Sequence, residues 1–364
     1  MKILIATNHS YMLYRFRREL IEALSEEHEV VLCMPFVGHE EDFQAMGLEC
    51  IPVELDRRST NPFRDLALFG QYRRIMDVVK PDVVITYSVK PNIYLGALCR
   101  LRRIAYFANV QGLGTAFERP ILSRIVARMY RVAVGGAKGV FFENEENAQF
   151  FQHLKIVKEN KTKVLPGAGI NLDSYSCVPL VDDGVCRFLY LGRIMQEKGI
   201  DEFFAAAKAL KEKFGHRVAF DVVGFYEDAY KETVEQLVEE GVIRFHGFQT
   251  DVKPFYEAAS CVVMPSYHEG MSNVLLEGAA MGRALITTDI PGCREAVADG
   301  VTGLLCPVKC AEGLQQAMER FFALGFQQQA EMGQQGHDFV AQRFDKRIVV
   351  EATIAYIHDA LNRT

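Results

Sequence analysis

The sequence predicts an α/β fold made of two Rossmann-like domains, each built on a parallel sheet. Short apolar runs, typical of buried strands, alternate with segments of helical spacing from one end of the chain to the other. The alternation stops once, near the middle, and then starts again. A chain of 364 residues also suits two cores of ordinary size better than one. We expect the two sheets to face a central cleft, where ligands commonly bind.

The first half of the chain predicts an N-terminal domain over residues 1–171. Apolar runs place strands at residues 2–6, 29–34, 82–87, 104–110 and 139–143. Helical spacing follows the first and third of these strands, at residues 14–25 and 95–101. Residues 172–184 carry Pro179, two aspartates and Gly184 without any periodicity, so we expect a linker there.

The second half repeats the pattern and predicts another domain over residues 185–344. Strands are expected at residues 187–191, 218–223, 243–246, 261–265, 284–288 and 303–306. Helices are expected between these strands at residues 201–214, 230–239 and 252–259, and after the last strand at residues 311–324. Residues 345–364 read as one closing helix.

Composition limits the classes of function. No apolar run approaches the roughly 18 residues that a membrane-spanning helix needs, and we expect a cytoplasmic protein. The nine cysteines are scattered without a Cys-x-x-Cys pair, which is typical of reduced core residues. Residues 1–170 carry a net charge of about +4 and the remainder about −10, so the basic half is expected to face an anionic partner. No nucleic-acid motif accompanies the arginines, and we expect no nucleic-acid partner.

Two carboxylates eight residues apart, Glu269 and Glu277, form the most informative motif. They follow the strand at 261–265 and enclose the start of a helix, and in open α/β sheets such strand-to-helix junctions bind ligands. Backbone N–H groups that open a helix bind phosphate, while a carboxylate accepts hydrogen bonds from vicinal hydroxyls. The motif predicts a nucleotide-sugar site. A solvated loop followed by an ordinary amphipathic helix is the alternative for this motif alone.

Missing motifs narrow the choice further. No Gly-x-Gly-x-x-Gly follows the first strand and no Walker sequence occurs, which argues against dinucleotide and ATP chemistry. No Asp-x-Asp occurs either, so we expect no metal and no cofactor. A diphosphate then needs side-chain cations, and Arg193 and Lys198 stand in the loop after the strand at 187–191. Two solvated loop cations are the competing interpretation.

Together these segments resemble the retaining GT-B glycosyltransferases of bacterial capsule, O-antigen and N-glycan assembly. The resemblance rests on Gly192-Arg193 through Lys198-Gly199, on Pro265 through Gly270, and on Asn273 through Ala279. It implies two Rossmann-like domains and a last helix that returns to the N-terminal domain. It also implies transfer of a hexose-type sugar from a UDP-sugar to an undecaprenyl-diphosphate-linked acceptor.

The resemblance assigns roles to the motif residues. Arg193 and Lys198 would hold the donor diphosphate, Glu269 the donor sugar and Glu277 the ribose. Arg193, Lys198 and Glu269 are therefore the expected catalytic residues. The remaining donor-site residues would contact two other parts of the donor. The residues expected near the phosphate are Gly270, Met271, Ser272, Asn273 and Val274. The residues expected near the base are Gly224 and Phe248.

The acceptor side is expected in loops of the N-terminal half. The candidate contacts are His9, Ser10, Lys90, Asn92, Gln111 and Gly112, each with a structural loop role as the alternative. Many members of the family carry a histidine after the strand at 104–110, whereas this chain has Gln111-Gly112 there. A role for a histidine side chain at this position therefore does not apply to this chain.

A basic amphipathic segment at residues 121–131 predicts contact with an anionic inner-membrane surface, with a core helix that has a solvated arginine face as the alternative. The location expected is therefore the cytoplasmic face of that membrane. Two other functions stay open at this point. A UDP-sugar 2-epimerase needs the same diphosphate clamp and ribose-binding glutamate, and a non-catalytic scaffold of a polysaccharide assembly complex needs neither.

Overall fold

The chain forms two units, each built around one parallel sheet. The computed structural model describes residues 1–56, 59, 61–112, 117 and 120–363. Unit 1 contains Met1–Ala168 and Arg347–Thr364, and unit 2 contains Gly169–Lys346. These two α/β units confirm the predicted fold class.

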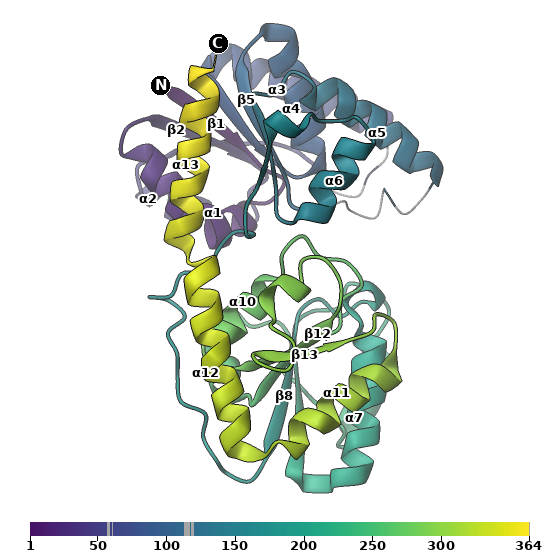
Figure 1. Cartoon of the computed structure of the whole chain (residues 1–364). Helices are drawn as coiled ribbons and strands as arrows, with labels where there is room; N and C mark the ends of the chain where they lie inside the picture. Colours follow the sequence, from purple (N-terminus) through teal and green to yellow (C-terminus); the bar gives the residue numbers. More distant parts are fainter. Residues whose placement is uncertain (57–58, 60, 113–116, 118–119, 364) are drawn as a thin grey trace. The chain divides into compact units, whose positions relative to one another are not determined.

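Unit 1 holds a seven-stranded sheet in the order β3-β2-β1-β4-β5-β6-β7 (Figure 1). Its strands are all paired in parallel: β1 (Lys2–Ala6), β2 (Glu29–Met34), β3 (Glu49–Pro52), β4 (Val83–Tyr87), β5 (Ala105–Val110), β6 (Gly139–Phe142) and β7 (Thr162–Val164). The strand order reverses between β1 and β4. Ligands bind at such a reversal, outside the carboxyl ends of the strands.

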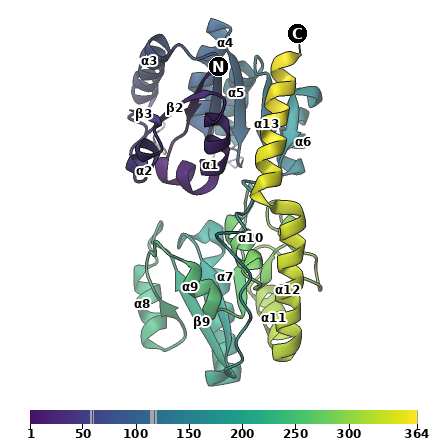
Figure 2. The ribbon, with the colours of Figure 1, turned by 90° about the vertical axis from the view of Figure 1, so that its left-hand side faces the viewer.

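Helices cover both faces of the first sheet. One core face packs against α3 (Pro62–Val79), α4 (Val89–Arg102), α5 (Pro120–Val134) and α6 (Glu145–His153). The other packs against α1 (Ser10–Ser25), α2 (Glu40–Ala45) and α13 (Lys346–Asn362), which is yellow in Figure 1 and Figure 2. Val349 and Ile357 of α13 are buried there together with Leu20 of α1, so the last helix completes the core of unit 1.

Unit 2 repeats this architecture with a six-stranded sheet in the order β10-β9-β8-β11-β12-β13. The strands are β8 (Cys186–Leu191), β9 (Val218–Val223), β10 (Arg244–Phe245), β11 (Cys261–Met264), β12 (Ala284–Thr288) and β13 (Gly303–Cys306). One face packs against α7 (Ile200–Phe214), α8 (Lys231–Glu239) and α11 (Ala311–Ala323), the other against α9 (Lys253–Ala258), α10 (Asn273–Ala280) and α12 (Gly325–Phe344). The strand order reverses between β8 and β11.

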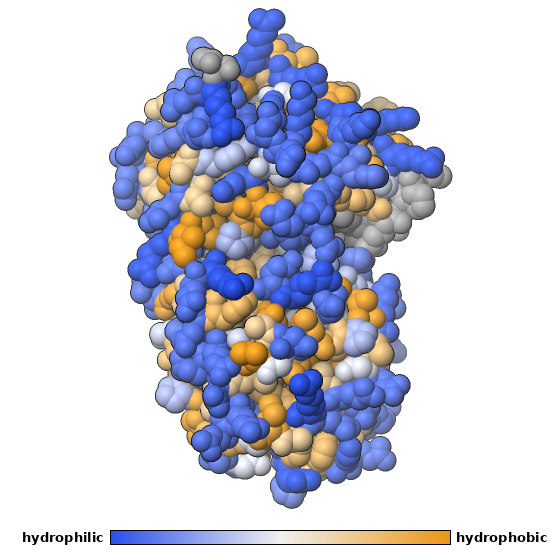
Figure 3. Space-filling model, in the orientation of Figure 1, coloured by the Kyte–Doolittle hydropathy of each residue, from blue (hydrophilic) through white to orange (hydrophobic). Residues whose placement is uncertain are grey.

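Apolar side chains account for both cores. Strand residues such as Phe107, Val140 and Val262 are fully buried. Hydrophilic side chains dominate the face drawn in Figure 3, with apolar residues scattered among them. Burial on both faces explains why the strands of a parallel sheet are almost continuously apolar in the sequence.

The segment expected to be a linker lies on unit 2. It has no helix or strand, and Val178 joins it to the end of α10 because its N–H donates to Met281 O at 3.3 Å. Arg283, a fully buried residue, donates from Nη2 to Val178 O at 2.6 Å. These bonds attach residues 172–184 to the second domain, so this segment is not a free tether.

No helix or strand was predicted for residues 325–344, where the structure has α12. Helix α12 ends at Phe344, because Asp345 has an extended conformation with ψ of 130°. The extended residue pairs with the segment that leaves unit 1: Ile170 N–H donates to Phe344 O, and Lys346 N–H donates to Ile170 O. A local backbone pairing therefore separates α12 from α13.

Candidate functional site

The predicted donor residues stand in two loops that leave neighbouring strands. Lys198 lies in the loop after β8, at the end of a short 3-10 helix over Gln196–Lys198, and Glu269 lies in the loop after β11. Strands β8 and β11 pair in parallel and flank the reversal in strand order. Both loops therefore leave the same edge of the second sheet, at the position where α/β sheets bind ligands.

Lys198 and Glu269 are in direct contact. Lys198 Nζ lies 2.5 Å from Glu269 Oε1, and only 15% and 12% of the two side chains are exposed. Ser266, which is fully buried, donates from Oγ to the same carboxylate oxygen at 2.8 Å. The structure thus brings together the cation predicted for the diphosphate and the carboxylate predicted for the sugar.

The loop that carries Glu269 is anchored to α7. Tyr267 donates from Oη to Glu202 Oε1 at 2.7 Å, and its N–H donates to Glu197 O at 2.9 Å. Burial and the neighbouring Glu202 carboxylate raise the pKa of the Tyr267 phenol, so it stays a neutral donor. The ammonium of Lys309 lies 4.9 Å from the centre of the same ring. These contacts hold Glu269 in place before any ligand arrives.

Arg193 is more loosely held than Lys198. Its guanidinium lies 3.8 Å from Glu227 Oε2, and 39% of its side chain is exposed. The backbone beside it is fixed, because Tyr190 donates from Oη to Arg193 O at 2.8 Å. Arg193 can therefore turn toward a ligand without breaking a short ion pair.

The start of α10 supplies backbone donors. The N–H groups of Asn273 and Val274 belong to its first turn, where a helix offers no acceptor, and the helix dipole is positive at that end. The backbone N–H of Ser272, which was predicted to bind the donor phosphate, is already used, because it donates to Gly292 O at 2.8 Å. Its Oγ is buried without a hydrogen-bond partner. Met271 is buried in the core of unit 2, so its side chain serves packing.

Glu277 is a buried carboxylate one turn further along α10. It is 3% exposed, and Tyr256 donates from Oη to its Oε2 at 2.9 Å. Tyr256 is the residue that sequence reasoning missed here, since it lies 21 positions earlier, on α9. No spacing rule connects the two, because the contact forms only when α9 and α10 pack on the same face of the sheet.

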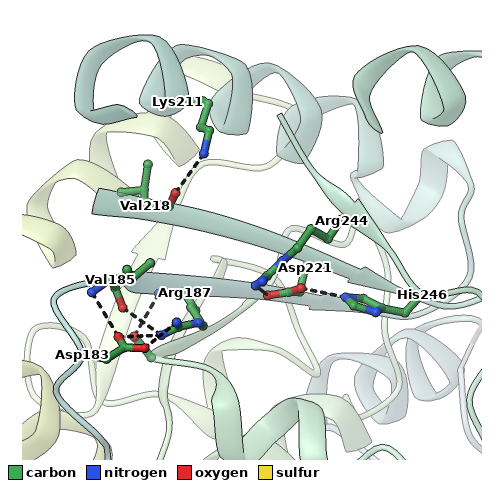
Figure 4. Close-up of polar contacts among 9 residues, drawn as sticks. Asp183, Val185, Arg187, Lys211, Val218, Asp221, Arg244 and His246 are labelled. Carbon is green, nitrogen blue, oxygen red and sulfur yellow. Dashed lines mark hydrogen bonds and ion pairs between the residues drawn. The ribbon is translucent and has the colours of Figure 1, made fainter. Parts of the chain in front are cut away.

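The residues predicted near the nucleotide base lie at the ends of β9 and β10. Gly224 donates its N–H to Gly247 O at 2.9 Å, and the exposed Phe248 follows directly. Asp221 fixes this corner, as Figure 4 shows: it accepts from Arg244 Nη2 at 2.5 Å, and His246 Nε2 lies 2.7 Å from its other oxygen. The Asp221–His246 contact was absent from the sequence prediction.

Replacing Gly224 with alanine is expected to lower the free energy of unfolding by about 1–3 kcal/mol. Its φ is +153°, and an added Cβ would lie 1.8 Å from Gly192 O, so the two loops must separate. Urea unfolding monitored by circular dichroism measures the change. Gly241→Ala is the matched control, because that residue has φ of +68° and open space around it. Equal losses in the two variants would mean that the clash has no effect.

Two acceptor-side predictions need correction. Asn92 is fully buried: its Oδ1 accepts from Thr86 and its Nδ2 donates to Asn109 O, at 2.7 and 2.8 Å. Ser10 is also fully buried, and its Oγ accepts from Val37 N–H at 2.9 Å. Both side chains satisfy backbone or side-chain groups of the fold, and we leave them out of the site.

The other acceptor-side residues are more accessible. Lys90 forms an ion pair with Asp65 at 2.7 Å and donates to Ser59 O at 2.8 Å, so its charge is already balanced. His9 precedes α1 and is half-buried, as are Gln111 and Gly112 after β5. Gln111 lines a small hollow together with Arg17 and Glu143.

Within the described residues, no group of three or more His, Cys, Asp or Glu side chains could hold a metal ion. The described helices also include none that is both long and apolar enough to cross a bilayer.

Comparison with known proteins gives relatives along most of the chain. An N,N'-diacetylbacillosaminyl-diphospho-undecaprenol alpha-1,3-N-acetylgalactosaminyltransferase from Campylobacter jejuni is 27% identical over 335 residues, covering 87% of this chain and 88% of the relative. The capsular polysaccharide biosynthesis glycosyltransferase CapM from Staphylococcus aureus is 23% identical, covering 79% and 81%. Both are curated as glycosyltransferases.

Solved structures share the fold. HepE from Anabaena, crystallised with UDP and glucose, superposes with a TM-score of 0.81 at 15% identity, covering 99% of this chain and 100% of HepE. A glycosyltransferase from Rickettsia africae gives a TM-score of 0.78 at 18% identity, covering 100% and 99%. At these identities the likeness concerns the fold alone.

Family models match each half separately. The model "Glycosyl transferase 4-like" matches residues 2–144, and the model "Glycosyl transferases group 1" matches residues 186–323. One match falls in each Rossmann-like unit, and together they include the Lys198 and Glu269 loops. The chain belongs to the group 1 glycosyltransferases of GT-B fold.

Proposed function

We propose that this protein is a retaining, metal-independent glycosyltransferase that moves a hexose-type sugar from a UDP-sugar to a polyprenyl-diphosphate-linked glycan. The contact between Lys198 and Glu269, at the reversal in strand order of the second sheet, carries the proposal. The activity for which the Campylobacter jejuni relative is named supports the acceptor class, and the UDP bound by HepE supports the donor class. The product would be a longer lipid-linked glycan for cell-surface polysaccharide synthesis.

Departure of UDP is the step that these residues would assist. As the bond to the sugar breaks, negative charge gathers on the diphosphate and positive charge on the sugar ring. Lys198, Arg193 and the N–H groups that open α10 would stabilise the leaving group. Side-chain cations and a helix start thus supply the countercharge that a metal ion supplies in other transferases. No side-chain base is assigned, and the departing phosphate would take the acceptor proton.

The ion pair suggests how donor binding would proceed. Glu269 already neutralises Lys198, so a diphosphate must share or replace that contact. The displaced carboxylate would then accept hydrogen bonds from hydroxyls of the donor sugar. Coupling the two events would align the sugar with its leaving group only when both parts of the donor are bound.

A direct assay separates the three candidate functions. The purified protein is incubated with a panel of UDP-sugars, with and without a short polyprenyl diphosphate that carries one N-acetylhexosamine. Sugar transfer with retained anomeric configuration, undiminished in EDTA, is expected only when the acceptor is present. Conversion of the UDP-sugar without acceptor would indicate an epimerase. Failure to bind any UDP-sugar by calorimetry would favour the scaffold.

A basic surface on unit 1 supports peripheral binding to an anionic membrane. Helices α4 and α5 pack side by side (Figure 1), and together they contain six Lys and Arg residues and no acidic residue. Three apolar side chains on these helices are well exposed: Leu101 at 74%, Ile125 at 49% and Val132 at 59%. Basic and apolar groups on one surface match an anionic phospholipid headgroup region. The nine free cysteines are consistent with the reducing cytoplasmic side.

Removing two arginines of this surface is expected to weaken vesicle binding. Arg124 and Arg128 are exposed on α5, and each basic residue near an anionic surface contributes about 1 kcal/mol. The double variant Arg124→Ala/Arg128→Ala should therefore bind phosphatidylglycerol vesicles roughly 30-fold more weakly in co-sedimentation. Lys231→Ala, exposed on α8, is the control and should bind like wild type. Binding that is equally strong to neutral vesicles, or unaffected by salt, would contradict the proposed surface.

A further inference from the structure

Tyr267 stands two positions before Glu269 and contacts two other segments of unit 2. Its Oη donates to Oε1 of Glu202, in the first turn of α7, at 2.7 Å. Its ring faces Lys309, in the loop after β13, with the ammonium nitrogen 4.9 Å from the ring centre. One side chain thus joins the loop after β11 to α7 and to the loop after β13. Neither Glu202 nor Lys309 is among the predicted site residues.

The backbone of Tyr267 is tied to the loop that carries Lys198. Its N–H donates to Glu197 O at 2.9 Å, within the short 3-10 helix that ends at Lys198. The two loops touch near this bond, because a Cβ added to Gly199 would lie 2.0 Å from Pro265 O. Tyr267 therefore stands where the loop of the predicted diphosphate cation meets the loop of the predicted sugar carboxylate.

Lys309 has an unusual backbone conformation. Its φ is +56°, in the left-handed region that residues other than glycine seldom occupy. Such a conformation persists where the surrounding structure fixes it, and it is frequent in functional segments. An ammonium over the face of an aromatic ring is attracted to the ring electrostatically. The loop after β13 therefore holds a cation in a favourable place over Tyr267.

Glu269 depends on the same loop for its position. Ser266, directly before Tyr267, donates to the Glu269 carboxylate at 2.8 Å, and Lys198 contacts the same oxygen. Hydrogen bonds form only over a narrow range of distances, about 2.5–3.2 Å between heavy atoms. A displacement of about 1 Å at a reacting centre can lower a rate by roughly 10²-fold. A side chain that fixes this loop can therefore control turnover without contacting the nucleotide.

We propose that Tyr267 is a positioning residue for sugar transfer, with Glu202 and Lys309 as its two supports. This inference rests on the proposed function. Glu202 and Lys309 fix the phenol ring, the ring fixes the loop after β11, and the loop sets where Glu269 meets the donor sugar. UDP alone carries no sugar and does not need this alignment. The backbone bond to Glu197 O remains in every side-chain variant, so the variants should change turnover and not UDP affinity.

The test separates turnover from UDP affinity. The kcat is measured with the UDP-sugar of the panel that supports the fastest transfer, and UDP affinity is measured by calorimetry. Tyr267→Leu is expected to lower kcat by about 10–100-fold at unchanged UDP affinity. Tyr267→Phe keeps the ring beside Lys309 and loses the bond to Glu202, so its loss should be smaller. Glu202→Gln keeps an oxygen that accepts from the phenol and should stay close to wild type.

Variants of Lys309 test the proposal even if the Tyr267 variants do not fold, because Lys309 is exposed. Lys309→Ala should lower kcat roughly two- to fivefold, the magnitude of an exposed cation–π contact. Lys309→Arg keeps a cation beside the ring and should restore the wild-type kcat. The double variant Tyr267→Leu/Lys309→Ala should be no slower than Tyr267→Leu, since Lys309 acts through the ring and the two losses are then non-additive.

Tyr230→Phe is the matched control. Tyr230, directly before α8, donates from Oη to Asp201 Oδ2 at 2.8 Å, which is the same kind of bond to the neighbouring residue of α7. This variant should keep the wild-type kcat. A wild-type kcat in folded Tyr267→Leu, or a loss of UDP affinity as large as the loss of kcat, would overturn the positioning role. Additive losses in the double variant would overturn the part assigned to Lys309. If wild type transferred sugar from none of the UDP-sugars, the proposed function itself would be wrong, and this inference with it.

Discussion

Replacing Lys198 with alanine is expected to lower kcat for sugar transfer by about 10²–10³-fold. The ammonium would stabilise the diphosphate as it leaves, so its loss acts on the transition state more than on donor binding. Steady-state kinetics with saturating donor and acceptor measures the effect. Lys208→Ala, an exposed lysine on α7 paired with Glu240, is the matched control and should keep the wild-type rate.

The ion pair adds a second consequence of the same substitution. Without Lys198, the largely buried carboxylate of Glu269 loses its countercharge, and stability should fall as well. The double variant Lys198→Ala/Glu269→Gln removes that uncompensated charge. It should recover much of the stability in urea unfolding while transfer stays as slow as in Lys198→Ala. If transfer recovered together with stability, Lys198 would be a structural residue and the leaving-group role would be wrong.

Replacing Glu277 with glutamine is expected to weaken UDP binding by roughly 10–100-fold, since hydrogen bonds to a charged group contribute about 1.5–3 kcal/mol. The carboxylate is placed by Tyr256, whose hydroxyl donates to Oε2, and is proposed to accept from the ribose hydroxyls. Isothermal titration calorimetry with UDP gives the affinity. Tyr256→Phe leaves the carboxylate but removes its orienting bond, so we expect a smaller loss.

A ligand without the ribose hydroxyls identifies the atoms involved. Wild-type protein should bind 2',3'-dideoxy-UDP more weakly than UDP, whereas Glu277→Gln should distinguish the two poorly. The two losses are then non-additive, as expected for groups in direct contact. Additive losses would place Glu277 away from the ribose and limit it to a role in the core of unit 2.

Local sequence patterns were sufficient to predict the fold, because the periodicity of a strand or helix depends on residues that are neighbours in the chain. The apolar runs that became β8 and β11 are buried on both faces, so their composition alone marks them as strands of a parallel sheet. Helix α12 was not predicted, because its local sequence does not mark it as a helix. Its residues are rich in glutamine and glycine, and its burial depends on packing against α10 and β12.

The candidate site also depends partly on local sequence patterns and partly on tertiary packing. The sequence by itself determined the two Rossmann-like units and the strand-to-loop positions of Lys198, Glu269 and Glu277, because these follow from periodicity and chain order. Tertiary structure alone decided the Lys198–Glu269 ion pair, the Tyr256–Glu277 bond and the Tyr267–Glu202 bond. Those partners are 71, 21 and 65 positions apart, and only the order of the strands within a sheet, and the packing of helices upon it, brings such distant side chains within hydrogen-bonding distance.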